Sequence, residues 1–253
     1  MHPVLLAFVI SVAVNAAFFV YAAIRKTDVV TDLSYSLSFA LVALALAALN
    51  GATDPYRLAL TAMVVVWAIR LGSYLFTRII KVKVDHRFDA MRDKPLKFAR
   101  FWILQAVTVG IVLVPAAVAM SAPGAFSALA AVGLCVWAAG LIIETVADQQ
   151  KKAFRQRGDA GFIATGLWSW SRHPNYFGES LAWIGVYLFC LPNLGAWTIP
   201  ALVSPVGITA LLLFVSGIPL LEKASDKKFG HLPEYADYKR RTSVFILLPP
   251  RSR

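Results

Sequence analysis

The sequence predicts an all-α integral membrane protein, a bundle of seven transmembrane helices with the N-terminus outside and the C-terminal tail in the cytoplasm. Three observations predict this fold. Hydrophobic residues make up 58 % of the 253 residues and charged residues only 15 %, whereas a soluble domain has about 25 % charged residues. Apolar runs of about 20 residues, the length that crosses ~30 Å of hydrocarbon, recur along the chain. Lysine and arginine cluster between alternate runs.

The apolar runs define seven expected spans within one membrane domain, residues 1–253. Because glycine and proline interrupt helices, they are expected to mark the external connections. A re-entrant hairpin is the alternative for residues 190–210, which contain several prolines. The glycines and prolines expected at the external connections are Gly51, Pro123-Gly124, Pro192 and Pro205. The expected spans are about 3–24, 33–50, 57–80, 101–120, 125–147, 179–202 and 205–221.

The first run and the two cysteines have simple interpretations. The first run has no basic region before it and leads into Arg25-Lys26, which is unlike a cleavable signal peptide. Cys135 and Cys190 both lie within apolar stretches, so we expect them to pack among apolar side chains. Their spacing suggests neither a metal site nor a disulfide.

The basic residues give the orientation. Of the 25 lysines and arginines, 23 lie on one side of this topology, Arg57 lies opposite and Arg70 lies within the third span. Because basic residues remain in the cytoplasm, the pattern places the C-terminus there. Membrane orientation thus accounts for the net charge of +11 and removes the main argument for a nucleic-acid partner. We expect the protein in a bacterial inner membrane.

One face of the third span carries a deeply placed arginine. Arg70 lies about ten residues, or roughly 15 Å, inside the cytoplasmic end of this span, and ionisable groups at such depth are functional candidates. Trp67, Arg70, Tyr74 and Arg78 are spaced to share one helix face. The alternative interpretation is an interfacial aromatic belt with one structural ion pair.

Acids and bases also gather at the cytoplasmic end of the fifth span. Asp148, Lys151, Lys152 and Arg155 lie three or four residues apart, on one side of a helix that leaves the membrane. A carboxylate beside several cations suits ribose hydroxyls next to phosphates. The alternative is a helix end whose basic side chains extend to the interface.

The segment from Gly166 to Glu179 is the most specific part of the sequence. It brings two tryptophans, an arginine and a histidine to a helix start at Pro174, whose free N–H groups can receive an anion. A plain interfacial anchor is the alternative. Its candidate residues are Trp168, Arg172, His173, Asn175, Tyr176 and Glu179, and the tail adds Glu222, Tyr235 and Tyr238. Without a family resemblance, that tail is typical of a basic juxtamembrane segment.

Other common chemistries lack their sequence patterns. His2, His86, His173 and His231 are scattered without zinc-ligand spacing, so no metal is expected. The Gly-rich fingerprint of soluble dinucleotide-binding domains is missing, as are the phosphate-binding loop and the serine-nucleophile elbow.

The motifs Asp148-Gln-Gln-Lys, Gly166-Leu-Trp, Ser171-Arg-His-Pro-Asn-Tyr-Phe-Gly-Glu179 and Glu222-Lys, followed by Tyr235 and Tyr238, resemble the bacterial branch of the steroid 5α-reductase family. The similarity extends from about the second span to the tail and is dense only from Asp148 to Glu179. Members of that family are seven-helix membrane enzymes that use NADPH to reduce the C4=C5 bond of a 3-oxo-Δ4 steroid. The eukaryotic members carry a Gln-Glu pair on the second helix and a tyrosine on the third.

The resemblance implies an NADPH site in the cytoplasmic half, completed by the tail, residues 222–253. We predict Asp32, Tyr35 and Tyr74 as catalytic, with Asp32 in place of the family's acid, and Asp32 and Trp67 as substrate-binding. Trp67 stands where the eukaryotic members have the tyrosine. The predicted cofactor-binding residues are Arg70, Arg78, Asp148, Lys151, Lys152, Arg155, Trp168, Arg172, His173, Asn175, Tyr176, Glu179, Glu222, Tyr235 and Tyr238.

The expected reaction is hydride transfer from NADPH to the β-carbon of a lipophilic enone, while a hydrogen-bonded acid stabilises the charge on the carbonyl oxygen. The substrate is expected to enter from membrane lipid. One alternative is a membrane methyltransferase of the isoprenylcysteine carboxyl methyltransferase type, which binds S-adenosylmethionine and shares the Arg-His-Pro segment. A transporter or lipid-binding scaffold is the third possibility.

Overall fold

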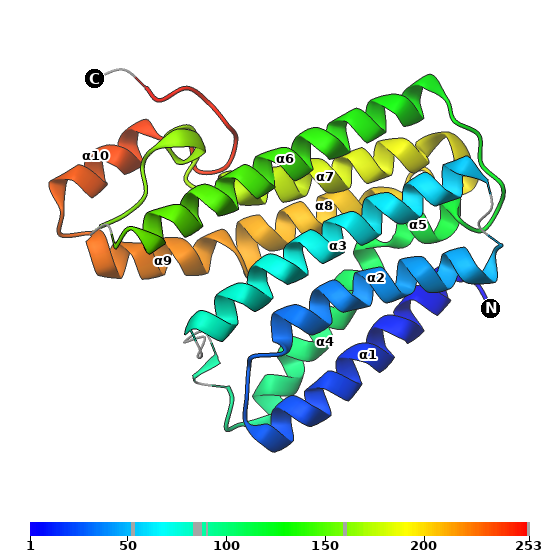
Figure 1. Ribbon diagram of the computed structural model, residues 1–253, viewed down its shortest axis with the longest axis horizontal. Coiled ribbons are helices and arrows are strands. Elements are labelled where there is room, and N and C mark those ends of the chain that lie inside the picture. The colour runs from blue at the N-terminus through cyan, green and yellow to red at the C-terminus, as the bar shows by residue number, and fades with distance from the viewer. Residues whose placement is uncertain (52–53, 83–87, 90, 159–160, 252–253) are drawn as a thin grey trace. The chain divides into compact units, whose positions relative to one another are not determined.

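A computed structural model describes residues 1–51, 54–82, 88–89, 91–158 and 161–251. The described residues form mostly α-helices and no strand longer than one isolated bridge, which confirms the predicted all-α class (Figure 1). The main helices are α1 (Pro3–Arg25), α2 (Thr31–Leu49), α3 (Pro55–Val82), α4 (Pro95–Val112), α5 (Val114–Ala119), α6 (Ala128–Gln156), α7 (Pro174–Cys190), α8 (Val203–Ala210), α9 (Ile218–Phe229) and α10 (Pro233–Arg241).

Six helical segments of the described chain are long and apolar enough to cross a membrane, so this is a multi-pass membrane protein. They correspond to six of the seven predicted spans. The fourth span begins at Pro95, six residues earlier than predicted, because proline fits the first turn of a helix. The six segments are Pro3–Arg25, Thr31–Leu49, Pro55–Lys81, Pro95–Val112, Ala128–Gln156 and Pro200–Phe229.

The span predicted at residues 179–202 has different bounds in the structure. The helix α7 begins at Pro174 and ends at Cys190. Its 17 residues make it shorter than each of the six candidate spans. Pro192, which has no N–H group to donate, follows the helix end. Short 3₁₀ turns then replace the predicted continuous helix, at Leu191–Asn193, Gly195–Trp197 and Pro200–Leu202.

The last predicted span, residues 205–221, is longer and interrupted in the structure. The helix α8 continues into η6 (Leu211–Val215), a π-helix, and α9 follows after Gly217. A Cβ atom at Gly217 would lie 2.5 Å from the Leu212 carbonyl oxygen, so glycine allows this close turn. The α9 helix extends to Phe229, eight residues beyond the predicted end, and carries charged side chains.

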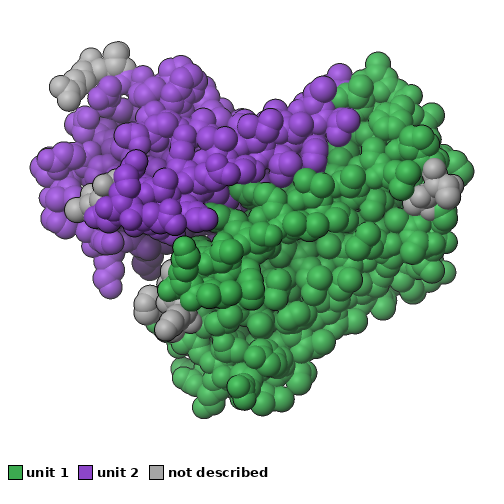
Figure 2. All heavy atoms as spheres, in the orientation of Figure 1, with its two compact units in different colours: residues 1–131, 186–204 green, residues 132–185, 205–253 purple. Residues whose placement is uncertain are grey.

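The chain divides into two compact units, shown in different colours in Figure 2. Unit 1 comprises residues 1–131 and 186–204, and unit 2 comprises residues 132–185 and 205–253. The expected single membrane domain stays a prediction, as do the seventh span and the orientation of the termini.

A buried polar network joins three helices of unit 1. Asn15 of α1 donates from Nδ2 to Ser38 Oγ of α2 at 3.0 Å. Gln105 of α4 donates from Nε2 to Asn15 Oδ1 at 2.7 Å and to Ser34 Oγ at 2.8 Å. Hydrogen bonds between helices substitute for the missing hydrophobic driving force inside a membrane. The network therefore fixes how these three helices pack.

In unit 2, glycines bring α6 and α7 into close contact (Figure 1). A Cβ atom on Gly140 would lie 2.4 Å from Ala182 N, and one on Gly178 would lie 2.5 Å from Glu144 N. Gly185 approaches Trp137 in the same way. Small residues permit such close backbone approach between membrane helices. This packing fixes the start of α7, and with it the preceding loop, against α6.

Candidate functional site

A cavity of about 450 Å³ opens in unit 2, within the size range of small-molecule sites. Its walls come from the end of α6, the loop before α7, α9 and α10. Four of the lining residues are lysine or arginine, one is acidic, and six are phenylalanine, tyrosine or tryptophan. The lining residues are Lys151, Phe154, Arg155, Gly158, Gly161, Phe162, Ile163, Trp168, Arg172, His173, Leu221, Glu222, Ala224, Ser225, Lys228, Phe229, Tyr235 and Tyr238.

Local contacts with α6 shape the loop before α7. Gly166 has a φ of +63° and leaves no room for a Cβ atom beside the Gln150 side chain. Gln150 Oε1 accepts a hydrogen bond from Leu167 N at 3.0 Å. Trp168, which is buried, donates from Nε1 to the Ala147 carbonyl at 3.0 Å. These contacts hold the first half of the loop to α6.

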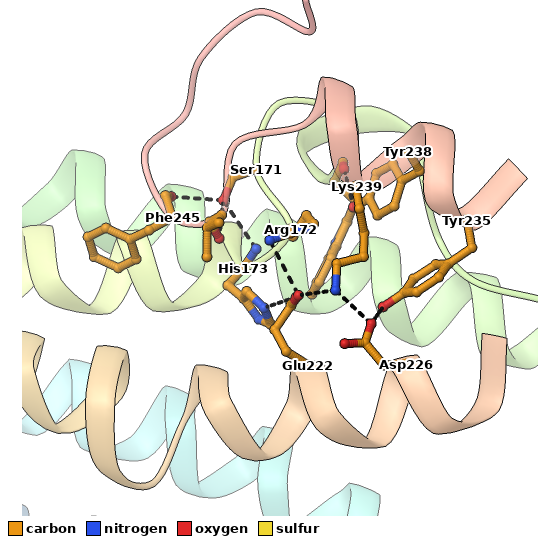
Figure 3. Close-up of polar contacts among 11 residues, drawn as sticks. Ser171, Arg172, His173, Glu222, Asp226, Tyr235, Tyr238, Lys239 and Phe245 are labelled. Carbon is orange, nitrogen blue, oxygen red and sulfur yellow. Dashed lines mark hydrogen bonds and ion pairs between the residues drawn. The ribbon is translucent and has the colours of Figure 1, made fainter. Parts of the chain in front are cut away.

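The C-terminal residues hold the second half of the same loop. The Tyr238 hydroxyl of α10 donates to the Trp168 carbonyl at 2.7 Å, and Arg172 N donates to the Ser243 carbonyl at 2.8 Å (Figure 3). The tail therefore positions Arg172 through the backbone. Two further contacts are Ser171 Oγ to the Phe245 carbonyl at 2.8 Å and Leu248 N to the Trp170 carbonyl at 3.2 Å.

Glu222 is the centre of the charged cluster in this cavity (Figure 3). Its carboxylate contacts Arg172 Nη2 at 3.3 Å, His173 Nε2 at 2.9 Å and Lys239 Nζ at 3.2 Å. Lys239 also reaches Asp226 Oδ1 at 2.6 Å. These contacts join α9 and α10 to the loop before α7, which lies much earlier in the sequence.

Asp226 extends the cluster by one helical turn. Its Oδ1 accepts a hydrogen bond from the Tyr235 hydroxyl at 2.9 Å in addition to the contact with Lys239. Burial, together with this carboxylate, raises the pKa of Tyr235 above its usual range, so the phenol stays protonated and donates. Burial opposes the charge of Lys239, but its bonds to Asp226 and Glu222 prevail and raise its pKa.

The two residues before α7 differ in charge. Burial lowers the pKa of His173 below its usual value, although Glu222 partly offsets this shift. His173 is therefore neutral at pH 7, and its Nε2–H donates a hydrogen bond to the Glu222 carboxylate at 2.9 Å, so this contact is not an ion pair. Arg172 keeps its charge, because a guanidinium is not deprotonated in proteins.

Two buried nitrogen atoms of these residues have no hydrogen-bond partner among the described residues: Arg172 Nε and His173 Nδ1. Buried polar atoms without a partner are uncommon, and each calls for an explanation. Arg172 Nε is a donor, whereas Nδ1 of a neutral His173 that donates from Nε2 is an acceptor. A ligand with an anionic oxygen and a hydroxyl would satisfy both.

Aromatic side chains form the wall between the 161–165 segment, α9 and α10. The ring of Phe162 lies 5.1 Å from the Tyr235 ring, 5.2 Å from the Tyr238 ring and 5.8 Å from the Phe229 ring, measured between centroids. Lys151 Nζ lies 4.5 Å above the Trp168 ring. Such surfaces suit a flat heterocycle, which stacks on aromatic faces.

The structure brings many of the predicted cofactor residues to this cavity. Asp148 and Glu179 do not line it, although both are buried in unit 2. The Tyr176 ring stacks on the His173 ring, with the two centroids 5.8 Å apart, and so packs against a cavity residue. Lys152 and Asn175 are also outside the lining. The predicted residues that do line the cavity are Lys151, Arg155, Trp168, Arg172, His173, Glu222, Tyr235 and Tyr238.

The remaining predicted residues belong to unit 1. Asp32 Oδ2 contacts Arg78 Nη2 at 3.1 Å, so a predicted catalytic acid and a predicted cofactor residue form an ion pair. Trp67 is buried, and its ring packs edge-on against Phe39 at 5.0 Å. The Tyr35 ring packs against the Phe39 ring with centroids 5.1 Å apart, and the Arg70 guanidinium lies 5.9 Å from the Tyr74 ring centroid. The roles predicted for these residues stay predictions.

Sequence reasoning missed several residues of the cluster. Asp226 lies one turn after Glu222 in a charged helix, and Lys239 follows Tyr238 directly, so both spacings carried a usable signal. Phe162 had none, because it lies in a loop without periodicity. In the described part of the chain, no group of three potential metal ligands comes together. His86 lies outside the described residues.

The family model described as "Protein of unknown function (DUF1295)" matches residues 18–242. The chain belongs to this family. The matched residues include every residue that lines the cavity. An uncharacterized protein, C594.04c of Schizosaccharomyces pombe, is 39 % identical over 89 residues, which are 34 % of this chain and 24 % of the yeast protein. The match thus spans about a quarter of that relative. No solved structure matches the chain.

Proposed function

We propose that this protein is an NADPH-dependent membrane reductase that acts on a C=C bond conjugated to the carbonyl group of a lipophilic substrate. The observation that carries the proposal is the pair of unpartnered buried atoms, Arg172 Nε and His173 Nδ1, in a cationic cavity with aromatic walls. The resemblance to the steroid 5α-reductase family supports a 3-oxo-Δ4 steroid as the substrate. Its bacterial branch supports a bacterial inner membrane as the location.

The residues of the cavity fit a dinucleotide. Arg172, Arg155 and Lys228 can bind phosphate oxygens, and His173 Nδ1 can accept a hydrogen bond from a ribose hydroxyl. The aromatic lining, which includes Tyr238, is proposed to contact the adenine ring. When bound, NADPH supplies a hydride to the substrate.

Two sets of predicted residues have separate proposed roles. Residues of unit 2 bind and orient the cofactor, and their burial excludes water. In unit 1, Tyr35 or Tyr74 is proposed to donate a proton, with Asp32 hydrogen-bonded nearby and Trp67 contacting the substrate. A proton donor placed at the carbonyl oxygen would stabilise the negative charge that develops there.

A membrane methyltransferase is the second candidate, because Arg172-His173-Pro174 and Glu222 also match that class in type and order. The single carboxylate of S-adenosylmethionine needs one cation, which Arg172 supplies. Arg155 and Lys228 also line the cavity, and neither forms an ion pair with a described acid. Additional cations favour a ligand with several phosphate charges.

Direct binding tests this proposal. The purified full-length protein is titrated with NADPH and with S-adenosylmethionine, and its tryptophan fluorescence is recorded. We expect saturable quenching by NADPH and NADPH oxidation when a 3-oxo-Δ4 steroid is added. Binding of S-adenosylmethionine alone would support the methyltransferase, and binding of neither would favour a transporter or scaffold.

A substitution at Asp148 extends the test beyond the cavity. Asp148→Ala should weaken NADPH binding while the helical circular dichroism stays unchanged, if the predicted role is correct. Glu234→Ala, at an exposed position in the first turn of α10, is the control and should bind NADPH normally. Equal affinities for the two variants would contradict the role of Asp148.

A further inference from the structure

The C-terminal loop, residues 241–251, is a closed structure with arginines at its base. Arg251 N donates to the Arg241 carbonyl at 3.0 Å, and Arg241 Nε donates to the Arg251 carbonyl at 2.9 Å. These reciprocal bonds bring together the ends of an 11-residue segment, within the size range of compact Ω-like loops. Arg240, at the end of α10, adds a third arginine beside them.

Alternate residues of the C-terminal loop have opposite surroundings. Phe245 faces inward, where its ring lies 5.6 Å from the Phe177 ring and its carbonyl accepts the Ser171 hydroxyl. Val244, Ile246 and Leu248 instead remain 42 %, 53 % and 52 % exposed. Three exposed aliphatic side chains on one short loop form an apolar patch that internal packing does not explain.

The position of the C-terminal loop indicates which partner covers this patch. Leu248 N bonds to the carbonyl of Trp170, which is 45 % exposed and lies four residues before the start of α7. Exposed tryptophan and basic residues beside apolar helices are typical of the membrane–water interface. The α10 helix also begins four residues after Phe229, the end of a candidate span.

We propose that the C-terminal loop is an interfacial membrane anchor. Val244, Ile246 and Leu248 insert among the acyl chains at the boundary, and the arginines at the base bind anionic lipid headgroups. Apolar side chains combined with basic residues are the arrangement that binds anionic membranes. The proposal of an anchor does not rest on the proposed reductase activity.

The anchor matters for the cavity because the C-terminal loop contacts the loop before α7 directly. Ser243 accepts the hydrogen bond of Arg172 N, and the next residue, Val244, is the first of the exposed apolar set. Membrane attachment would therefore hold the backbone next to Arg172 at a fixed depth. The lipid contact and the charged cluster share one short segment of chain.

Depth-dependent quenching tests the proposal on the full-length protein in phosphatidylcholine–phosphatidylglycerol bilayers. Cys135 and Cys190 are replaced by alanine, and one cysteine is introduced at Ile246 for a fluorescent label. We expect quenching by nitroxide lipids and loss of quenching by aqueous iodide. A label introduced at Glu234, which is exposed on α10, is the matched control and should show the reverse.

The outcomes separate the possible environments of Ile246. Iodide quenching equal to that at Glu234 would overturn the anchor, because the patch would face water. Protection from both quenchers would also overturn it, since a protein partner would then cover the patch. Replacing Arg240 and Arg251 by glutamine should remove the increase in lipid quenching that phosphatidylglycerol gives over phosphatidylcholine alone.

A second measurement avoids the cysteine substitutions. In bilayers of brominated lipid, wild type and Trp170→Phe are compared, and the difference gives the quenching of Trp170 itself. We expect Trp170 to be quenched in wild type and to lose this quenching in the triple variant Val244→Ser, Ile246→Ser, Leu248→Ser. An unquenched Trp170 in wild type would contradict the interfacial position.

Discussion

Arg172 joins the structural cluster to the proposed ligand. Its Nη2 contacts Glu222, while its Nε has no partner among the described residues. Arg172→Gln should therefore raise the Kd for NADPH by roughly 10- to 100-fold, since a hydrogen bond to a charged group contributes about 1.5–3 kcal/mol. Fluorescence titration measures this. Arg240→Gln, on the exposed side of α10, should bind as wild type does, and a similar loss in both variants would contradict the assignment.

His173 makes the stability of unit 2 depend on pH. Because burial lowers its pKa below the usual 6.5, the unfolded chain binds more protons than the native protein in mildly acidic solution. The stability that neutral His173 gives is thus complete above pH 6.5 and is lost as the pH falls below that value. Thermal unfolding in detergent at a series of pH values should show this decrease.

The matched variants for this pH dependence are His173→Gln and His231→Gln. Without the imidazole at position 173, the decrease in stability below pH 6.5 should become smaller. His231 is exposed, so its replacement should leave the wild-type profile. If the two variants unfold with the same pH dependence, His173 is not the responsible group.

At the scale of elements, the contact between α6 and α7 has no room for added atoms. A Cβ atom at Gly178 would lie 2.5 Å from Glu144 N, a backbone atom that cannot move alone. Gly178→Ala should lower the free energy of unfolding by about 1–3 kcal/mol, the usual cost of overpacking. The melting temperature in detergent measures it. Ala139→Leu, at an exposed position of α6, adds more atoms and should cost much less.

The elements also show where sequence patterns succeed. Apolar length predicted the long helices, because crossing a membrane requires about 20 apolar residues whatever their neighbours are. The helix start at Pro174 is confirmed, although the apolar run alone placed the span at 179–202. The predicted end was wrong, since apolarity alone does not separate a helix from the turns after Pro192.

At the scale of the whole molecule, the distribution of basic residues predicts how the chain is oriented in the membrane. The N-terminus is predicted outside and the C-terminus in the cytoplasm, with Arg57 on the external side. Reporter fusions that are active only on one side of the membrane should place Arg253 inside and the 51–56 connection outside. The opposite pattern, obtained at both sites, would refute the assigned topology.

The candidate site was only partly readable from the sequence. Arg172 and His173 were predicted because they directly precede a helix start at Pro174, and Glu222 because its motif resembles the steroid 5α-reductase family. Their mutual contacts, and the addition of Lys239 and Phe162, depend on how α9 and α10 fold back on the loop before α7. No local pattern encodes that return, since it arises from tertiary hydrogen bonds such as Tyr238 to Trp168.

The π-helix η6 lies between α8 and α9 and changes the direction in which the side chains after it point. A π turn contains one residue more than the corresponding α turn, so it rotates everything after it by about 100° about the axis. Deleting one residue between Leu211 and Val215 would remove the π turn and shift Glu222 relative to Arg172 without changing any residue of the cluster. The length of this segment is therefore as strict a requirement for the cavity as the identity of its side chains.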